Sequence, residues 1–270
     1  MSVMVSNGLF DAYSLAGRVA VITGSGRGIG AATARRLAEA GADCVLVART
    51  ASQLDEVASA IESLGRRAVV FAEDVNDLTV LARVVDGTIS EFGRIDVLVN
   101  NAGGSASPAF LDTRADHLEA SFHFNVTVTF ELSRLSVPHM LNGGYGSIIN
   151  IGSNAGTKLL RGSLVHGTTK AAINHMTRLM AADLAPRIRV NAVAPGAIET
   201  ESLKRWLETL SAEARNMMVE RTPMRRNGTP DDIAFAVHYL ASPASAWVTG
   251  KVFEVDGAAM GEIVPKSPDL

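Results

Sequence analysis

The sequence contains one cysteine, few aromatic residues and no long uncharged apolar run. Because Cys44 is the one cysteine among 270 residues, an internal disulfide is excluded, which is typical of a protein from a reducing compartment. The first thirteen residues lack the basic and apolar regions of a signal peptide, and no apolar stretch approaches the roughly 18 residues of a membrane span. These absences predict a cytoplasmic protein with no membrane partner.

A strong charge of either sign is also lacking. The formal net charge is −3, and arginines occur at most in pairs such as Arg35-Arg36, so we expect no nucleic-acid partner. We also expect no metal site. With 47% hydrophobic and 20% charged residues, the chain can bury a substantial core. We therefore expect one domain over residues 1–270, with terminal extensions at 1–14 and 258–270 and Cys44 as a buried core residue.

Apolar β-branched runs alternate with stretches of helical period along the whole chain. The runs predict seven strands, at Val19–Thr23, Cys44–Val47, Ala68–Phe71, Ile95–Val99, Ser147–Ile151, Ile188–Val193 and Val252–Val255. The stretches predict helices at Ile29–Ala40, Ser52–Leu64, Leu78–Phe92, Leu118–Leu141, Thr168–Leu184 and Asp231–Leu240. This alternation predicts an α/β protein with a Rossmann-type, doubly wound and mainly parallel sheet covered by helices on both faces.

A glycine-rich segment follows the first expected strand. Residues 23–30 read TGSGRGIG and lead directly into an expected helix. Glycines permit a tight turn and a close approach of the backbone, and the N-terminus of a helix favours a phosphate group. The segment therefore indicates a nucleotide site, although a strand-to-helix turn that merely needs small residues is the alternative.

Three motifs together resemble those of the short-chain dehydrogenase/reductase family. They are the segment at 23–30, Asn-Asn-Ala-Gly at 100–103 and Pro-Gly at 195–196, and the resemblance runs from about Leu15 to Gly257. It implies an oxidoreductase that binds a nicotinamide dinucleotide, with Asp74 and Val75 against the adenine. The cofactor-binding residues that we expect are Gly24, Ser25, Arg27, Gly28, Ile29, Gly30, Arg49, Asp74, Val75, Asn101, Ala102, Gly103, Lys170, Pro195, Gly196, Ile198 and Thr200.

The choice between NAD and NADP depends on the end of the second strand. An acidic residue there would bind the ribose 2′-hydroxyl, whereas an arginine suits a 2′-phosphate. The chain has Arg49 at this place and a second arginine, Arg27, inside the glycine loop. Each arginine alone also fits an exposed surface charge, but the pair predicts NADP as the cofactor.

The catalytic residues implied by the resemblance are present except for one. The family combines a serine at a strand end, a tyrosine and a lysine one helical turn apart, and an asparagine on the neighbouring helix. Ser153, Lys170 and Asn125 match, but His166 stands at the tyrosine's place, 13 residues after Ser153 and four before Lys170. Positions i and i+4 share a helix face, so we expect His166 and Lys170 to point toward the nicotinamide. Tyr13, Tyr145 and Tyr239 lie elsewhere in the sequence.

By resemblance, Ser153 binds the substrate oxygen, Lys170 binds the nicotinamide ribose, and Asn125 supports a water leading to Lys170. Without their spacing, a serine at a strand end and a lysine on a helix are commonplace and carry no functional signal. Asn125 stands between Phe124 and Val126, so it needs a polar partner if it is buried.

Histidine changes the proton chemistry that this site can perform. The ordinary pKa of an imidazole is about 6.5, against about 10 for a phenol, and two neighbouring cations, Lys170 and the oxidised nicotinamide, would lower it further. The hypothesis is that His166 supports alcohol oxidation at neutral pH, whereas carbonyl reduction improves as the pH falls. The alternative is a protein that binds NADP, has lost hydride transfer and acts as an interaction or regulatory protein.

The substrate is a small molecule that the sequence describes only by polarity. Leu203, Trp206, Leu207 and Leu210 recur at helical spacing in a segment that covers the substrate in the family, and Leu159, Leu160, Leu164 and Val165 are further candidates. Packing against the sheet or another subunit is an equal alternative. The segments 122–140 and 174–184 look similar to bacterial hydroxysteroid dehydrogenases, which suggests a hydrophobic secondary alcohol or ketone, such as a ring compound. The resemblance also implies a homotetramer, with the helices ending near Leu141 and Leu184 pairing across subunits.

Overall fold

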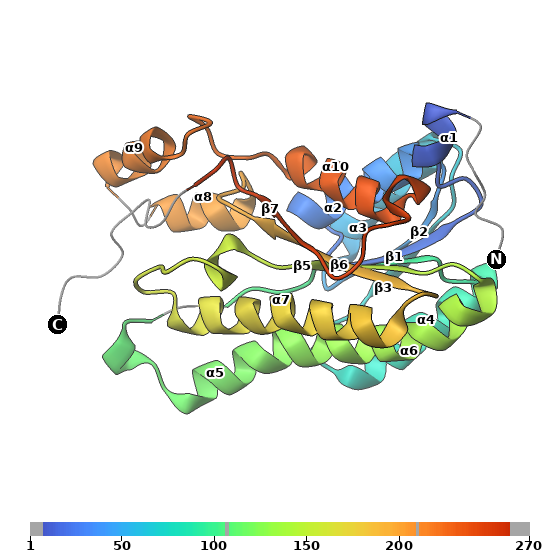
Figure 1. The fold of residues 1–270 in the computed structure, drawn as a ribbon, viewed down its shortest axis with the longest axis horizontal. Coiled ribbons are helices and arrows are strands. Elements are labelled where there is room, and N and C mark those ends of the chain that lie inside the picture. The colour runs from blue at the N-terminus through green and yellow to red at the C-terminus, as the bar shows by residue number, and fades with distance from the viewer. Residues whose placement is uncertain (1–7, 106–107, 209–210, 260–270) are drawn as a thin grey trace.

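Seven parallel strands form a single sheet at the centre of the molecule (Figure 1). A computed structural model describes residues 8–105, 108–208 and 211–259. The strands are β1 Val19–Thr23, β2 Asp43–Ala48, β3 Ala68–Ala72, β4 Val97–Asn100, β5 Ser147–Ile151, β6 Arg189–Pro195 and β7 Val252–Val255. Their order across the sheet is β3-β2-β1-β4-β5-β6-β7. The predicted doubly wound sheet is confirmed, and each strand lies within two residues of its expected bounds.

Helices cover both faces of the sheet. In chain order they are α1 Leu9–Tyr13, α2 Gly28–Glu39, α3 Ala51–Ser63, α4 Leu78–Phe92, α5 Ala115–Phe122, α6 Val128–Gly143, α7 Leu164–Leu184, α8 Glu201–Glu208, α9 Ala212–Arg221 and α10 Pro230–Ala241. Figure 1 shows α2, α3 and α10 on one face and α4, α6 and α7 on the other. In the part of the chain that the structure describes, none of the helices is long and apolar enough to cross a membrane.

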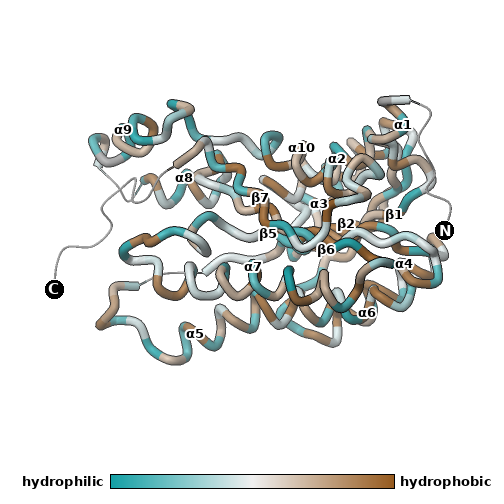
Figure 2. Tube along the Cα trace, viewed as in Figure 1, coloured by the Kyte–Doolittle hydropathy of each residue, from teal (hydrophilic) through white to brown (hydrophobic). Residues whose placement is uncertain are grey.

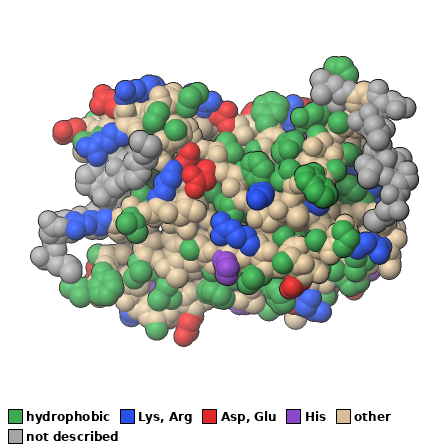
Figure 3. Space-filling view, viewed as in Figure 1, with side chains coloured by type: hydrophobic (Ala, Val, Ile, Leu, Met, Phe, Trp, Pro, Cys, Tyr) green, Lys and Arg blue, Asp and Glu red, His purple; other side chains and the backbone are tan. Residues whose placement is uncertain are grey.

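Each face of the sheet has its own apolar core, visible in Figure 2 as hydrophobic segments along the strands. Leu37, Ile61 and Val237 pack in the core beneath α2, α3 and α10, and Val84 and Leu132 pack in the opposite one. Such strands, buried on both faces, are expected in a parallel sheet. On the outside, acidic and basic side chains are interspersed on the face seen in Figure 3.

Cys44 lies in the first of these cores, as the sequence predicts. Its side chain is fully buried, and the Sγ–H donates to the backbone carbonyl of Ala34 at 3.6 Å. Burial raises the pKa of this thiol to about 12. The thiol therefore stays protonated and packs as a small apolar group.

Two helices near the site differ from their expected form. The single helix expected at Leu118–Leu141 is a run from 115 to 143 with a π turn at His123–Thr127 between α5 and α6. The helix expected from Thr168 begins four residues earlier, at Leu164, so His166 is helical as well. Sequence periodicity misses the π turn because its one extra residue shifts the apolar pattern by only part of a turn.

The N-terminal extension is more ordered than the sequence suggests. Residues 9–13 form α1, and the Tyr13 ring contacts the rings of His238 and Tyr239 on α10. The carbonyl of Tyr13 also accepts a hydrogen bond from Nε2 of His238 at 2.7 Å. Residues 1–7 of this extension and residues 260–270 of the C-terminal extension lie outside the described residues.

Close packing joins α7 to the loop that follows β5. A Cβ added to Gly156 would lie 2.7 Å from the backbone carbon of Lys170 and 2.8 Å from the nitrogen of Ala171. The absence of a side chain at 156 therefore lets the loop touch the backbone of α7. Behind it, Asn150 of β5 donates to Thr177 of α7 at 2.9 Å and accepts from Asn100 of β4 at 2.9 Å. These buried bonds fix α7 against the carboxyl ends of the strands.

The contact at Gly156 yields a stability prediction. Gly156→Ala should lower the free energy of unfolding by about 1–3 kcal/mol, because the added methyl group meets backbone that cannot rotate away. Thermal unfolding followed by circular dichroism measures this as a fall of several degrees in Tm. Gly143→Ala is the matched control, since a methyl group there meets no described atom within 4 Å apart from its chain neighbours and the backbone of its own helix. Equal Tm values for the two variants would contradict the packing argument.

Candidate active site

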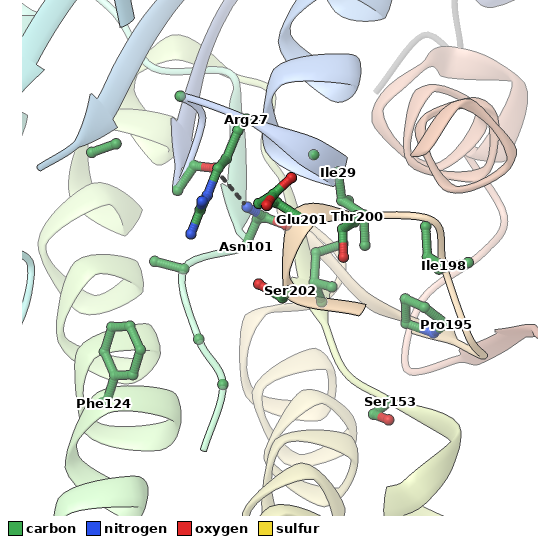
Figure 4. A pocket seen from close by; sticks show the side chains of 18 of the residues that line it. Arg27, Ile29, Asn101, Phe124, Ser153, Pro195, Ile198, Thr200, Glu201 and Ser202 are labelled. Carbon is green, nitrogen blue, oxygen red and sulfur yellow. Dashed lines mark hydrogen bonds between the residues drawn. The ribbon is translucent and has the colours of Figure 1, made fainter. Parts of the chain in front are cut away.

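A cavity of about 540 Å³ opens at the carboxyl ends of the strands. Because all seven strands are parallel, the loops after β1, β2, β3, β4, β5 and β6 meet at this edge and contribute to its lining (Figure 4). A volume of this size is typical of a cofactor or small-molecule site. The residues expected to bind a cofactor all line it except Ser25 and Gly30.

The glycine loop forms the floor of one end of the cavity. Asn101 Nδ2 donates to the carbonyls of Thr23 and Gly24 at 2.9 and 3.1 Å, which holds the loop against the end of β4 (Figure 4). A Cβ on Gly30 would lie 2.2 Å from the Gly24 carbonyl oxygen, so this glycine closes the turn from behind. Ser25 is also buried, and its hydroxyl donates toward the Val47 carbonyl at 3.5 Å. Both residues therefore shape the loop, and the N-terminus of α2 faces the cavity.

Two arginines and two carboxylates line the cavity where the glycine loop is near the ends of β2 and β3. Arg27 and Arg49 line the cavity with Glu73 and Asp74. The guanidinium of Arg49 lies 3.9 Å from the carboxylate of Asp74, and their side chains are 74% and 46% exposed. A wide, exposed pair of this kind contributes little free energy. The arginine can therefore exchange its carboxylate partner for a phosphate group.

The first residue of the Asn-Asn-Ala-Gly motif, at 100–103, connects strands of the sheet, whereas the other three line the cavity. Asn100 is buried and donates to Ser133 and Asn150, so its role is to join β4 to its neighbours. The backbone N–H groups of Asn101 and Ala102 both donate to the Thr23 hydroxyl at 3.0 Å. These bonds place Ala102 and Gly103 along the cavity wall.

Ser153, His166 and Lys170 line the same cavity, as the spacing predicts. Ser153 begins a short helical turn at Asn154–Gly156, where its Oγ accepts from the Ala155 N–H at 3.1 Å. His166 and Lys170 lie one turn apart on α7, and His166 is half-buried. A hydrogen bond of 3.2 Å joins His166 Nδ1 to the hydroxyl of Ser105.

Lys170 is a buried base whose pKa is strongly lowered. It is 6% exposed, and its Nζ donates to the carbonyl of Ile151 at 2.9 Å. Burial lowers the pKa of this amine from 10.5 to about 8, because an ammonium group is poorly solvated there. Lys170 is therefore protonated at neutral pH, and its ammonium group is poorly hydrated. Such a group favours binding of a polar ligand in the cavity.

Asn125 lies behind the cavity and does not line it. It is 1% exposed in the π turn, where its Oδ1 accepts from the Gly104 N–H at 2.9 Å. Its Nδ2 donates to the carbonyls of Gly104 and Ser121 at 3.0 and 2.8 Å. The predicted need for a polar partner is confirmed. The side chain clamps the loop 101–104, and the expected water relay to Lys170 stays a prediction.

None of the three tyrosines, all of which lie in the described residues, lines the cavity. Tyr145 packs beneath the guanidinium groups of Arg18 and Arg189, and its hydroxyl donates to the Ala241 carbonyl. Tyr13 and Tyr239 contact one another near the C-terminal end of α10. Instead of a tyrosine, His166 lines the cavity one turn before Lys170 on α7.

The apolar residues expected around the substrate separate in the structure. Leu203 lines the cavity, and Trp206 and Leu207 are half-buried on the same face of α8, while Leu210 lies outside the described residues. Leu159 is 95% exposed, Leu164 is 43% exposed and Val165 is 1% exposed. These three and Leu160 are absent from the cavity lining. For Val165 the reason is that α7 begins at Leu164 and turns Val165 into the core.

Several lining residues are missed by the sequence argument. Gly26 lies inside the segment 23–30 but is not among the expected cofactor-binding residues. The others carry no motif of their own: Val47, Ala48, Thr50, Gln53, Glu73, Gly104, Phe124, Ile151, Gly152, Ala197, Glu201 and Ser202. Glu201 and Ser202 begin α8 directly after Thr200 (Figure 4). In the described residues, no group of three or more His, Cys, Asp or Glu side chains could hold a metal ion.

Known proteins resemble this chain over nearly its whole length. A family model described as enoyl-(acyl carrier protein) reductase matches residues 24–258. An uncharacterized oxidoreductase of Mycobacterium tuberculosis is 46% identical over 92% of this chain and 94% of its own length. The 7alpha-hydroxysteroid dehydrogenase of Escherichia coli K12 is 39% identical over 94% of this chain and 98% of its own.

A solved structure matches as well. It is a 7alpha-hydroxysteroid dehydrogenase in complex with NADH and 7-oxo glycochenodeoxycholic acid, with a TM-score of 0.89 and 38% identity. The match covers 94% of this chain and 98% of that one.

The pKa of Lys170 predicts how stability depends on pH. Between about pH 8 and 10.5 the folded chain loses the lysine proton while the unfolded chain keeps it, so the free energy of unfolding should rise with pH, by about 3 kcal/mol in total from this group. Urea unfolding of the cofactor-free protein at several pH values measures the rise.

Lys170→Met is the control for this measurement, because it removes the titrating group and keeps an apolar chain of similar length. The difference in unfolding free energy between the native chain and the variant should grow from pH 8 to pH 10.5. A constant difference across this range would show that Lys170 is fully hydrated in the folded state.

Proposed function

Because the chain belongs to the short-chain dehydrogenase/reductase family and is an oxidoreductase of that type, we propose that it interconverts a secondary alcohol and a ketone with NADP(H) as cofactor. The observation that carries the proposal is the lining of a single cavity. Ser153, His166 and Lys170 share it with the glycine loop and with Arg27. A hydrogen-bonding group, an acid or base and a buried cation thus stand beside a phosphate cradle.

The residues present fit a nicotinamide dinucleotide. The turn from Gly24 to Gly30 leaves no room for a side chain behind it, so the backbone at the N-terminus of α2 can approach a pyrophosphate. Lys170 offers a poorly hydrated ammonium group to ribose hydroxyls at the other end. When bound, such a cofactor supplies the acceptor or donor of a hydride. The chain must then supply or remove the matching proton.

We assign the transfer of this proton to His166. During oxidation the imidazole takes the proton of the alcohol hydroxyl, and Ser153 holds the same oxygen by a hydrogen bond. Lys170 lies one turn away on α7, and its positive charge favours loss of the proton from the alcohol hydroxyl. During reduction the protonated imidazole returns the proton to the carbonyl oxygen. Asn125 contributes indirectly, since it holds the loop on which the cavity wall depends.

NADP is favoured over NAD by the two arginines. Arg27 and Arg49 both line the cavity, and the weak pair of Arg49 with Asp74 leaves its guanidinium accessible. A guanidinium binds a 2′-phosphate by paired charge-assisted hydrogen bonds. The similar 7alpha-hydroxysteroid dehydrogenase holds NADH, so the two arginines are the features on which this part of the proposal depends.

A hydrophobic or ring-shaped substrate fits the remaining lining. Phe124, Ile198 and Leu203 bring apolar surface to the cavity from three different segments of the chain. Two similar proteins named above act on hydroxysteroids by name. An apolar secondary alcohol would be desolvated against these residues while its hydroxyl reaches Ser153.

We also propose a homotetramer, which the family resemblance implies and which exposed apolar side chains on the helices beside the site support. Phe122 on α5, Phe130 on α6 and Leu179 on α7 are 47%, 48% and 54% exposed. Apolar surface of this kind on neighbouring helices favours pairing with another copy of the chain.

The pH dependence of turnover tests the role of His166. Ketone reduction by the native chain should be at least about 20 times faster at pH 6 than at pH 8, because only a protonated imidazole can donate and the protonated fraction falls by at least this factor when the pKa is about 6.5 or lower. His166→Tyr should reduce ketones at rates that change less than threefold over this range, since a phenol stays protonated there. Steady-state kcat with NADPH and a panel of cyclic ketones measures both.

His166→Phe is the control, and it should bind NADPH normally while kcat falls at least 100-fold. A native chain that binds NADPH without turnover, and that gains activity as His166→Tyr, would contradict oxidoreductase chemistry at this histidine and favour a regulatory NADP-binding role. A flat pH profile with full activity would also contradict the assignment.

Calorimetric titration tests the cofactor. Arg49→Ala should weaken NADPH binding about tenfold or more and change NADH binding less than twofold, because only NADPH carries the 2′-phosphate. Arg83→Ala is the matched control, since Arg83 pairs with Glu73 at 3.1 Å but does not line the cavity. Equal affinity of the native chain for the two cofactors would refute the preference.

A further inference from the structure

Ser105 and His166 meet at the cavity from distant parts of the chain. Ser105 follows the loop after β4, and His166 lies 61 residues later, in the first turn of α7. Ser105 Oγ and His166 Nδ1 are 3.2 Å apart, within hydrogen-bonding range. Nδ1 is the ring nitrogen nearer the backbone, and Nε2 lies at the tip of the ring. The contact therefore fixes the ring through the nitrogen that is less able to reach a substrate.

The loop that carries Ser105 is itself held in place. The N–H of Gly104 donates to Asn125 Oδ1 at 2.9 Å, and its carbonyl accepts from Asn125 Nδ2 at 3.0 Å. Because Asn125 is 1% exposed and also bonded to Ser121, it cannot easily rotate. Both backbone groups of the residue before Ser105 are thus fixed. The Ser105 hydroxyl that contacts the imidazole is therefore attached to a segment of backbone that Asn125 holds in place.

We propose that Ser105 is a positioning residue for His166: its Oγ accepts a hydrogen bond from Nδ1–H and so assigns proton exchange with the substrate to Nε2. The inference rests on the proposed function and adds a residue to it. A ring with Nδ1–H carries its lone pair on Nε2, where a base needs it. A serine that instead donated to Nδ1 would place the ring proton on Nε2 and block this role.

The same contact suits the ring in both protonation states. During oxidation the alcohol O–H bond breaks and an Nε2–H bond forms, while the carbinol hydrogen leaves with its electron pair as a hydride to the oxidised nicotinamide. The resulting imidazolium carries a proton on each nitrogen. Ser105 Oγ accepts from Nδ1–H before and after this step, so the ring needs no rotation between base and acid.

A double-mutant cycle tests the positioning role. Ser105→Ala in the native background should lower kcat for alcohol oxidation about tenfold, with KM changed less than twofold. In the His166→Tyr background the same substitution should change kcat less than twofold, because a phenol has no Nδ1 to hold. Ser105→Thr keeps the hydroxyl and should restore at least a third of native kcat. Equal losses from Ser105→Ala in both backgrounds would overturn the proposal.

A second measurement does not depend on turnover. NMR of the full-length protein labelled with ¹⁵N-histidine reports which ring nitrogen is protonated, and the His166 signals are those missing in His166→Tyr. With a neutral ring, His166 should carry its proton on Nδ1 in the native chain and in Ser105→Thr, and shift toward Nε2–H in Ser105→Ala. The same protonation pattern in the native chain and Ser105→Ala would overturn the proposal.

The two measurements separate the two hypotheses. If the native chain and its variants bind NADPH but none turns over, the proposed function fails, and the NMR result still decides whether Ser105 sets the state of the ring. If turnover is present and the cycle shows no coupling between positions 105 and 166, the proposed function stands and the role of Ser105 fails.

Discussion

The hydrogen bond from Lys170 Nζ to the carbonyl of Ile151 is the contact on which the geometry of the site depends. It joins the second turn of α7 to the last residue of β5 in a place where the ammonium group has little access to water. Gly156 permits the close approach from one side, and the buried bond between Asn150 and Thr177 supports it from within. Because His166 lies one turn before Lys170 and Ser153 two residues after Ile151, both side chains are placed by this single junction. A buried amine is costly to hold in this way, and the cost is met where a charged ligand is to be recognised.

The fold could be predicted from sequence because its signals are local. Strands such as Val19–Thr23 and Ser147–Ile151 are short apolar runs, and their alternation with helical stretches determines a parallel sheet almost by itself. The glycine loop and the placement of Ser153, His166 and Lys170 in one cavity also followed from spacing. Parallel strands bring their carboxyl ends to one edge, so residues that follow strands meet there even when they are far apart in the chain.

What could not be predicted depends on contacts between distant segments. Nothing in the residues around Ser105 indicates that its hydroxyl meets a ring 61 positions later. The clamp of Asn125 on Gly104 also needs a π turn that apolar periodicity does not reveal. Val165 and Leu164 were expected at the substrate, but a helix that starts four residues earlier than expected turns one inward and the other outward. In each case a small local change in helix geometry decides where a side chain points.

The π turn at His123–Thr127 has a consequence for the helices on either side of it. A π turn contains one residue more than an α turn, and one residue corresponds to about 100° of rotation around a helix axis. A stripe of side chains along α5 therefore does not continue along the same side of α6. In the structure α5 packs against α7, whereas α6 packs against α4. One continuous helical run can in this way satisfy two neighbours lying in different directions, and removal of a single residue from the turn would bring the two stripes back into line and leave one neighbour facing the wrong surface.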